Sequence, residues 1–207
     1  METWIYLIRH GSTVANDARP YVLQGSGVDH PLNEAGREQA RRAAAFLSSE
    51  AFDAVYSSQL ARAQETAVAI AQPHGLEVNT VENIHEVDVG DWEGQDWHTI
   101  MDSDAAAYAA FMENPWLNPY PGGECYLDVL RRAKPTLLKL AESNVGRRII
   151  VVAHQVVNRA LLADFMSVTP ERARGIRQKN TGINVIRWRP DEIEVVTVNA
   201  CFHLAGL

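Results

Sequence analysis

The sequence predicts an α/β fold: a three-layer α/β/α sandwich with a mainly parallel central sheet and helices on both of its faces. Two short apolar runs, residues 4–8 and 148–153, are typical of strands that are buried on both faces. Helix and strand patterns alternate along the chain, which favours parallel strands joined by helices. With 207 residues, the chain is expected to form one domain over residues 1–207 and to bury about 70% of its unfolded surface.

The first half of the chain contains five predicted elements. The first strand precedes a polar, glycine-containing segment, Gly11 to His30, which we expect to be a long loop. Asn33 is a good N-cap for the helix that follows, because apolar residues recur after it at helical spacing. These apolar positions are Ala40, Ala43, Ala44 and Leu47. The next elements are a strand over residues 52–56, a helix over about 59–71 and an edge strand over 76–81.

The second half begins with a loosely patterned segment, residues 82–123, which is rich in tryptophan, acidic residues and proline. It contains one alanine-rich helical piece over residues 105–112. We expect a substrate-covering insertion over about residues 92–122, since long irregular segments in compact domains often serve binding sites. Regular elements then return: a helix over about 124–142, the strand over 148–153, a helix over 156–165, and a hairpin of strands over 183–189 and 193–198.

The charge and composition argue against several kinds of partner. The formal net charge of −7 would repel nucleic acids and anionic membranes, so neither is an expected partner. No apolar stretch approaches the ~20 residues of a membrane span, and the N-terminus lacks the pattern of a secretory signal. Cys125 and Cys201 have no metal-ligand spacing, and reduced thiols in a cytoplasmic protein are the simpler interpretation. The oligomeric state is left open.

Chemically competent side chains follow the two apolar strands directly. Arg9, His10 and Gly11 end the first run, and His154 ends the second. Ligands bind outside the carboxyl ends of strands in open α/β sheets, so we expect both histidines to share one site. The guanidinium of Arg9 suits two phosphate oxygens, and a neutral imidazole is a competent nucleophile. The alternative is that each histidine has only a structural role, which is commoner than catalysis for a single histidine at a strand end.

Arg62 is a second candidate cation. It lies in the first turn of the predicted helix that follows Ser57 and Ser58. On spacing alone, an ion pair on the surface with Glu65 is the better interpretation. Its strand end should nevertheless face the same sheet edge as Arg9, and two guanidinium groups would balance most of the charge of a phosphate.

Taken together, these residues resemble the signature of the histidine phosphatase superfamily, in its phosphoglycerate-mutase-like branch. The matching segments occur in the order of the family and cover nearly the whole chain. They are Arg9-His10-Gly11-x-Thr13-x-x-Asn16, Gln24-Gly25, Asp29-x-Pro31-Leu32, Gly36, Ser57-Ser58 with Arg62-Ala63-x-Glu65-Thr66, Glu86 with Gly90-Asp91-Trp92-Glu93-Gly94, Pro121-Gly122-Gly123-Glu124, and His154.

The resemblance implies a role for each matching residue. His10 would be the nucleophile that becomes phosphohistidine. The phosphoryl oxygens would be bound by Arg9, Asn16, Arg62 and His154, and the substrate by Thr13, Gln24, Gly25 and Gln155. No metal ion and no cofactor are implied, because the arginines and the second histidine neutralise the charge.

Glu86 would be the general acid, and it would later deprotonate the attacking water. Its family position favours it over four nearby candidates: His85, the strongest of them, and Asp88, Asp91 and Glu93. A solvated acidic loop with no catalytic role is the alternative for this stretch.

Gln155 stands where many family members have glycine. It fits the Ala-His-Gln-x-Val pattern of the fructose-2,6-bisphosphatase domain, a local similarity. Contact with substrate and simple packing at a helix start are equally good interpretations of it.

The predicted function is a metal-independent phosphomonoesterase that acts through phosphohistidine on a small phosphorylated metabolite. Phosphoryl shuttling of the phosphoglycerate-mutase type is the first alternative, and a non-catalytic phospholigand-binding protein is the second. The stretch from Glu86 to Gly94 resembles the phosphatase branch more than the mutase branch, and the candidate catalytic residues are all present.

Overall fold

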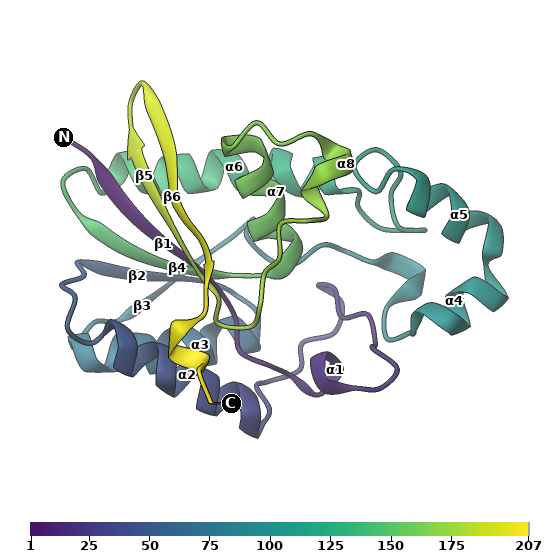
Figure 1. Cartoon of the computed structure of the whole chain (residues 1–207), viewed down its shortest axis with the longest axis horizontal. Coiled ribbons are helices and arrows are strands. Elements are labelled where there is room, and N and C mark those ends of the chain that lie inside the picture. The colour runs from purple at the N-terminus through teal and green to yellow at the C-terminus, as the bar shows by residue number, and fades with distance from the viewer. Residues whose placement is uncertain (207) are drawn as a thin grey trace.

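A computed structural model describes residues 1–206, and within them six strands form one sheet in the order β3-β2-β4-β1-β5-β6 (Figure 1). The first four strands run parallel, whereas β5 is antiparallel to β1 and β6 is antiparallel to β5. The α/β fold with a mainly parallel sheet is therefore confirmed. The strands are β1 (Thr3–Arg9), β2 (Ala54–Ser58), β3 (Val78–Val81), β4 (Arg148–Ala153), β5 (Ile183–Arg189) and β6 (Glu192–Ala200).

Helices cover both faces of this sheet. In the view of Figure 1, α2 (Glu34–Leu47) and α3 (Ala61–Ala71) lie below it, and α6 (Tyr126–Ser143) and α7 (Gln155–Phe165) lie above it. The side chains of each strand alternate between two hydrophobic cores. In β1, Ile5 and Leu7 belong to the core under α6 and α7, whereas Ile8 belongs to the core under α2 and α3. Burial on both faces explains why the central strands are continuously apolar.

Helix α2 forms as its sequence predicts. The side chain of Asn33 accepts a hydrogen bond from the backbone N–H of Gly36 at 2.8 Å, which satisfies one free donor of the first turn. All four expected apolar positions, Ala40, Ala43, Ala44 and Leu47, are buried.

The expected boundary between β2 and α3 is two residues too early. We expected Ser57 and Ser58 to end the strand, but both pair with β3, and Ser57 also pairs with β4. Their backbone is therefore part of the ladder, and α3 begins only at Ala61 without a side-chain cap. Tertiary strand pairing decided this boundary, because serine by itself favours turns and caps.

Short helices account for most of the elements that the sequence did not predict. The expected loop from Gly11 to His30 contains α1 (Val14–Asp17), and α8 (Pro170–Ala173) follows α7. In the expected insertion, α4 (Trp97–Ser103) precedes the predicted alanine-rich helix α5 (Ala105–Glu113). Single turns of 3₁₀ helix occur at Gln72–His74, Gly90–Trp92 and Phe202–Leu204.

The insertion carries an aromatic cluster of its own. The ring of Trp92 lies 6.1 Å from Trp97, 5.6 Å from Phe111 and 5.8 Å from Tyr120, measured between ring centroids, and each pair is T-shaped. These contacts hold α4 and α5 together beyond the carboxyl end of the sheet (Figure 1). That this segment covers a substrate stays a prediction.

The topology brings three strand ends to one edge of the sheet. Arg9, the last residue of β1, is paired with Ala153, the last residue of β4. Strand β2 flanks β4 on its other side and ends at Ser58. No helix within residues 1–206 is both long and apolar enough to cross a membrane.

Candidate active site

His10 lies at the centre of this edge as a buried side chain with one defined tautomer. Its Nδ1 lies 2.7 Å from the carbonyl oxygen of Gly11, which can only accept, so Nδ1 carries the ring proton and Nε2 is left with its lone pair. The imidazole is 2% exposed. Burial lowers the pKa of His10 well below its ordinary value, and the charges of Arg9 and Arg62 lower it further. At neutral pH the ring is therefore neutral and nucleophilic at Nε2.

The loop of His10 is held from several sides. The N–H of His10 donates to Ala153 at the end of β4, and the N–H of Gly11 donates to the hydroxyl of Thr66 on α3. Gly11 permits a close approach of its loop to the backbone of α2. A Cβ at Gly11 would lie 2.5 Å from the carbonyl oxygen of Gly36.

His154 lies beside His10, with 5.1 Å between the ring centroids. Its Nε2 is 2.9 Å from the hydroxyl of Ser58, and that hydroxyl accepts a backbone N–H from Leu60. Among the described residues Nε2 of His154 is the one acceptor bonded to this hydroxyl, so we assign the Ser58 proton to that bond and the ring proton of His154 to Nδ1. Burial is also the main reason why the pKa of His154 lies well below its ordinary value, with Arg62 next. His154 is therefore a neutral donor.

The two arginines are buried and oriented by backbone carbonyls. Arg9 donates through Nη1 to the carbonyl of Gln178 at 2.8 Å. Arg62 donates through Nη1 to Val28 at 3.1 Å and through Nη2 to Gly25 at 2.8 Å. The predicted surface pairing of Arg62 with Glu65 is not formed. Glu65 instead contacts Arg37, and Arg62 is 0% exposed.

Three buried nitrogens at this edge have no hydrogen-bond partner. They are Nε of Arg9, Nε of Arg62 and Nδ1 of His154, and each belongs to a residue at or just beyond a different strand end. A buried donor without a partner costs about 1–3 kcal/mol. Three of them around one imidazole indicate a site built for an anion with several acceptor oxygens.

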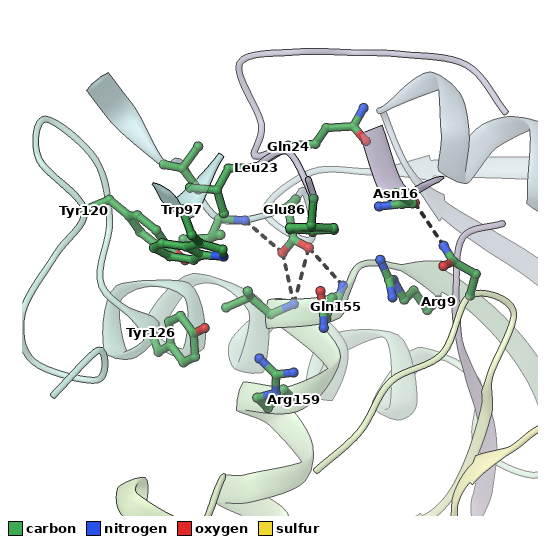
Figure 2. A pocket seen from close by; sticks show the side chains of 15 residues that line it. Arg9, Asn16, Leu23, Gln24, Glu86, Trp97, Tyr120, Tyr126, Gln155 and Arg159 are labelled. Atoms are coloured by element: carbon green, nitrogen blue, oxygen red, sulfur yellow. Dashed lines mark hydrogen bonds between the residues drawn. The ribbon is translucent and has the colours of Figure 1, made fainter. Parts of the chain in front are cut away.

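Glu86 is 5% exposed and is fixed by backbone donors. Its carboxyl oxygens accept the N–H of Val87 at 3.0 Å, and at the start of α7 those of Gln155 at 2.9 Å and Val156 at 3.1 Å (Figure 2). These bonds tie the segment that carries Glu86 to the residues that directly follow His154. They aim the carboxyl group at the pocket, which it helps to line.

A pocket of about 300 Å³ adjoins these groups: Arg9 and Glu86 line it, whereas His10, Arg62 and His154 are buried and are not among its lining residues. In Figure 2, Trp97, Tyr120 and Tyr126 lie to one side of Glu86, with Arg9 and Asn16 on the other. Its lining residues are Arg9, Asn16, Tyr21, Leu23, Gln24, Glu86, Val87, Val89, Trp97, Tyr120, Tyr126, Gln155, Val156, Arg159 and Asn180. One wall is thus aromatic and aliphatic, and the other is cationic and amide-bearing.

Of the remaining predicted residues, Asn16 has its side chain at the pocket. Its Oδ1 accepts from the N–H of Thr13 at 3.2 Å and from the Nδ2 of Asn180 at 3.1 Å, so its own amide N–H groups remain to donate. Gln24 and Gln155 also line the pocket. Thr13 does not line it, and its hydroxyl donates to Oε1 of Gln24 at 2.6 Å. Contact of these residues with substrate stays a prediction.

The backbone groups of Gly25 are both engaged elsewhere. Its N–H donates to Glu93 at 2.7 Å, and its carbonyl accepts from Arg62. A Cβ at this position would lie 2.6 Å from the carbonyl oxygen of Val87. In this structure Gly25 supports Arg62, and its predicted role in substrate binding is untested.

The competitors of Glu86 are placed differently. Asp88 bonds to the N–H of Gly90, and Glu93 bonds to those of Gly25 and Gly27. Asp91 is exposed, and half-buried His85 has its pKa lowered by burial and by Arg132. Among these five groups only Glu86 lines the pocket, which agrees with its selection as the general acid.

The residues that sequence reasoning missed include Tyr126, Arg159 and Asn180, which line the pocket, and Gln178, whose carbonyl binds Arg9. Arg159 lies four residues after Gln155 on α7, so helical spacing places it on the same face and would have identified it. Asn180 and Gln178 belong to the irregular segment before β5. That segment carries no pattern, and it reaches the site only because β5 runs antiparallel beside β1.

The fold and the site define a phosphoryl-transfer protein whose candidate nucleophile is a histidine. The model of the histidine phosphatase superfamily (branch 1) matches residues 5–201, and the chain belongs to this superfamily. The family makes it a phosphoric monoester hydrolase. No group of three or more His, Cys, Asp or Glu side chains that could hold a metal ion occurs between Met1 and Gly206.

Two curated relatives and one solved structure illustrate the similarity. Phosphoserine phosphatase 1 of Hydrogenobacter thermophilus is 30% identical over 200 residues, which is 97% of this chain and 93% of that protein. Phosphoglycerate mutase-like protein 4 of Arabidopsis thaliana is 39% identical over 191 residues, covering 88% of this chain and 78% of the relative. The structure of Bacillus stearothermophilus YhfR superimposes with a TM-score of 0.90 at 28% identity, with 98% of this chain and 99% of that chain covered.

Proposed function

We propose that His10 is the nucleophile of a metal-independent phosphomonoesterase that acts on small phosphorylated metabolites. One observation carries this proposal: at the sheet edge where His10 has an unprotonated Nε2, buried Arg9, Arg62 and His154 each keep one nitrogen without a hydrogen-bond partner among the described residues, and the rings of His154 and His10 are 5.1 Å apart. A phosphoryl group would give each of these donors an acceptor. The family and a relative that is named a phosphoserine phosphatase support the proposal.

The first step is transfer of the phosphoryl group to His10. Nε2 attacks phosphorus, the N–P bond forms, and the bond from phosphorus to the ester oxygen breaks. Arg9, Arg62, His154 and Asn16 donate to the phosphoryl oxygens, where charge is spread in the transition state. Protonated Glu86 gives its proton to the leaving alkoxide, so that an alcohol departs.

The second step is hydrolysis of phosphohistidine. The carboxylate of Glu86 takes a proton from water, and the resulting hydroxide attacks phosphorus. The N–P bond breaks, inorganic phosphate forms, and His10 regains its neutral ring. The bonds from Val87, Gln155 and Val156 keep Glu86 in place between the two steps.

The central test compares His10→Ala with His74→Ala, a matched change at a histidine beyond the end of α3. In EDTA, the unmodified protein is expected to release phosphate from p-nitrophenyl phosphate and to give phosphohistidine at position 10 in a rapid acid-free quench, followed by mass spectrometry. His74→Ala should do the same, and His10→Ala should lose both signals. Full activity of His10→Ala, or a strict need for added metal, contradicts the mechanism.

The same experiment separates hydrolysis from phosphoryl shuttling. If the phosphoenzyme is mixed with a sugar phosphate, a phosphatase releases inorganic phosphate, whereas a mutase transfers the phosphoryl group to the acceptor. We expect release to water, because the stretch from Glu86 to Gly94 resembles the phosphatase branch. A non-catalytic phospholigand-binding protein would bind phosphate without forming phosphohistidine.

We further propose that the protein is cytoplasmic and binds neither nucleic acid nor membranes. The net charge of −7 supports the second statement. Cys125 and Cys201 are both free thiols, which fits a reducing compartment.

A further inference from the structure

A second pocket adjoins the first and has about 450 Å³ of its own. The two pockets share one wall, made of Arg9, Gln155, Arg159 and Asn180. A molecule in the first pocket can therefore extend past this wall into the second pocket. The lining residues of the second pocket are Arg9, Gln39, Gln155, Arg159, Arg177, Gln178, Lys179, Asn180 and Leu204.

The charge of this pocket is opposite to that of the whole chain. Its lining includes Arg9, Arg159, Arg177 and Lys179 and no carboxylate, in a protein of net charge −7. In the part of the chain that the structure describes, none of the last three makes an ion pair. The positive charge of Arg159 contributes to the lowered pKa of Arg9, so the two guanidinium groups repel one another. An anion between them would relieve this repulsion.

The cations are held at the pocket by the fold. Gln178 is buried, and its carbonyl accepts from Arg9 while its amide nitrogen donates to Asn184 at 2.9 Å. Arg177 and Lys179 flank this anchored residue and are exposed. Arg159 uses only Nε, which donates to the carbonyl of Ile176 at 3.2 Å, so its two terminal nitrogens remain for a ligand.

We propose that the second pocket binds a second anionic group of the substrate, a carboxylate or a second phosphate, through Arg159, Arg177 and Lys179. This inference rests on the proposed function and narrows it to phosphomonoesters with two anionic ends. The phosphoryl group of such a substrate would lie at His10, and its second anionic group would lie beyond the shared wall, in the second pocket. Arg177 and Lys179, the two exposed cations of these three, would together strengthen binding about tenfold, which corresponds to about 1.4 kcal/mol.

The test measures competitive inhibition of p-nitrophenyl phosphate hydrolysis, which gives an inhibition constant whether or not the inhibitor is hydrolysed. The first inhibitor pair is 3-phosphoglycerate and glycerol 3-phosphate, which differ only by a carboxylate in place of a hydroxymethyl group. The second pair is glucose 1,6-bisphosphate and glucose 6-phosphate. In the unmodified protein, the inhibitor with two anionic groups should bind about tenfold more tightly in at least one pair. That pair identifies the second group as a carboxylate or a phosphate.

The double variant Arg177→Gln/Lys179→Gln should bring this ratio close to one. The control Lys139→Gln/Arg147→Gln removes the same charge at exposed positions near the opposite end of the sheet and should keep the ratio. A ratio near one in the unmodified protein, or one unchanged by Arg177→Gln/Lys179→Gln, overturns the inference. If p-nitrophenyl phosphate is not hydrolysed at all, the proposed function itself fails.

Discussion

At the scale of single residues, what each side chain of the site can do depends on which of its atoms already makes a hydrogen bond. His10 and His154 both carry the ring proton on Nδ1, but Nδ1 of His10 is bonded to Gly11 and that of His154 is unpartnered. The first histidine can therefore attack and the second can donate. Glu86 differs from the other acids of its segment because its carboxyl group reaches the pocket, with α7 holding it there.

Glu86→Gln should separate the two chemical steps. An amide cannot give or take the required proton, so the rate on an alkyl phosphate should fall by about 10²–10⁴-fold. p-Nitrophenolate leaves without a proton, and the variant should therefore release one rapid equivalent of it before slow turnover. Stopped-flow absorbance measures this burst. Asp91→Asn, at an exposed neighbouring acid, should behave like the unmodified protein. An equally rapid first release of alcohol from the alkyl phosphate by Glu86→Gln would remove Glu86 from leaving-group protonation.

At the scale of elements, α6 positions the segment that carries Glu86. Arg132 on α6 makes a two-point ion pair with Glu124, at 2.8 and 2.9 Å, and Glu124 in turn accepts the N–H of Asp88. The same guanidinium donates to the carbonyls of Asn83, His85 and Glu86. The half-buried guanidinium of Arg132 thus holds the segment around Glu86, which is neither strand nor helix.

Arg132→Gln should lower kcat more than it lowers folding stability. Without the hydrogen bonds from Arg132, three backbone carbonyls at and just before Glu86 lose their donor. A displacement of about 1 Å can lower the rate about 10²-fold. Arg131→Gln, at the exposed neighbouring arginine, is the matched control. If Arg132 acts through Glu86, the loss should largely disappear in a Glu86→Gln background, since coupled residues are not additive. Equal losses in both backgrounds would assign Arg132 a purely structural role.

At the scale of the whole molecule, the fold holds two histidines in a buried, cationic environment. For both, burial lowers the pKa, so the folded protein binds fewer protons than the unfolded chain once the pH falls below 6.5. Stability from these residues is complete above that pH and is lost as the pH falls toward the folded-state pKa. Below pH 6.5 the two buried histidines therefore lower the free energy of unfolding, and phosphate binding to the folded protein would offset this loss.

Urea unfolding between pH 7.5 and 5.5 should show this loss of stability. We expect the free energy of unfolding to fall below pH 6.5 with a slope of up to about 1.4 kcal/mol per pH unit for each histidine whose pKa is lowered, which includes His85 and His203 besides His10 and His154. The carboxylates with lowered pKa values, such as Glu124, act at lower pH and do not contribute in this range. Saturating inorganic phosphate should raise stability throughout. A free energy that stays constant from pH 7.5 to 5.5 would contradict the linkage.

The sequence by itself determined the parts that local chemistry dictates. Apolar runs with polar ends specify strands that deliver Arg9, His10 and His154 to one edge, since parallel strands share a carboxyl end. Helical periodicity and the Asn33 cap likewise specify α2. The family motif selected Glu86 among several acids, and the pocket agrees with that choice.

Only the tertiary structure decided what depends on contacts distant in sequence. Ser58 belongs to a strand because β3 pairs with it, and Arg62 is held in a buried position because the carbonyls of Val28 and Gly25 accept from its terminal nitrogens Nη1 and Nη2. The cations beyond the phosphate site, Arg177 and Lys179, lie in a segment without periodicity. Strand β5 brings this segment to the site by pairing with β1, and no local propensity encodes that pairing.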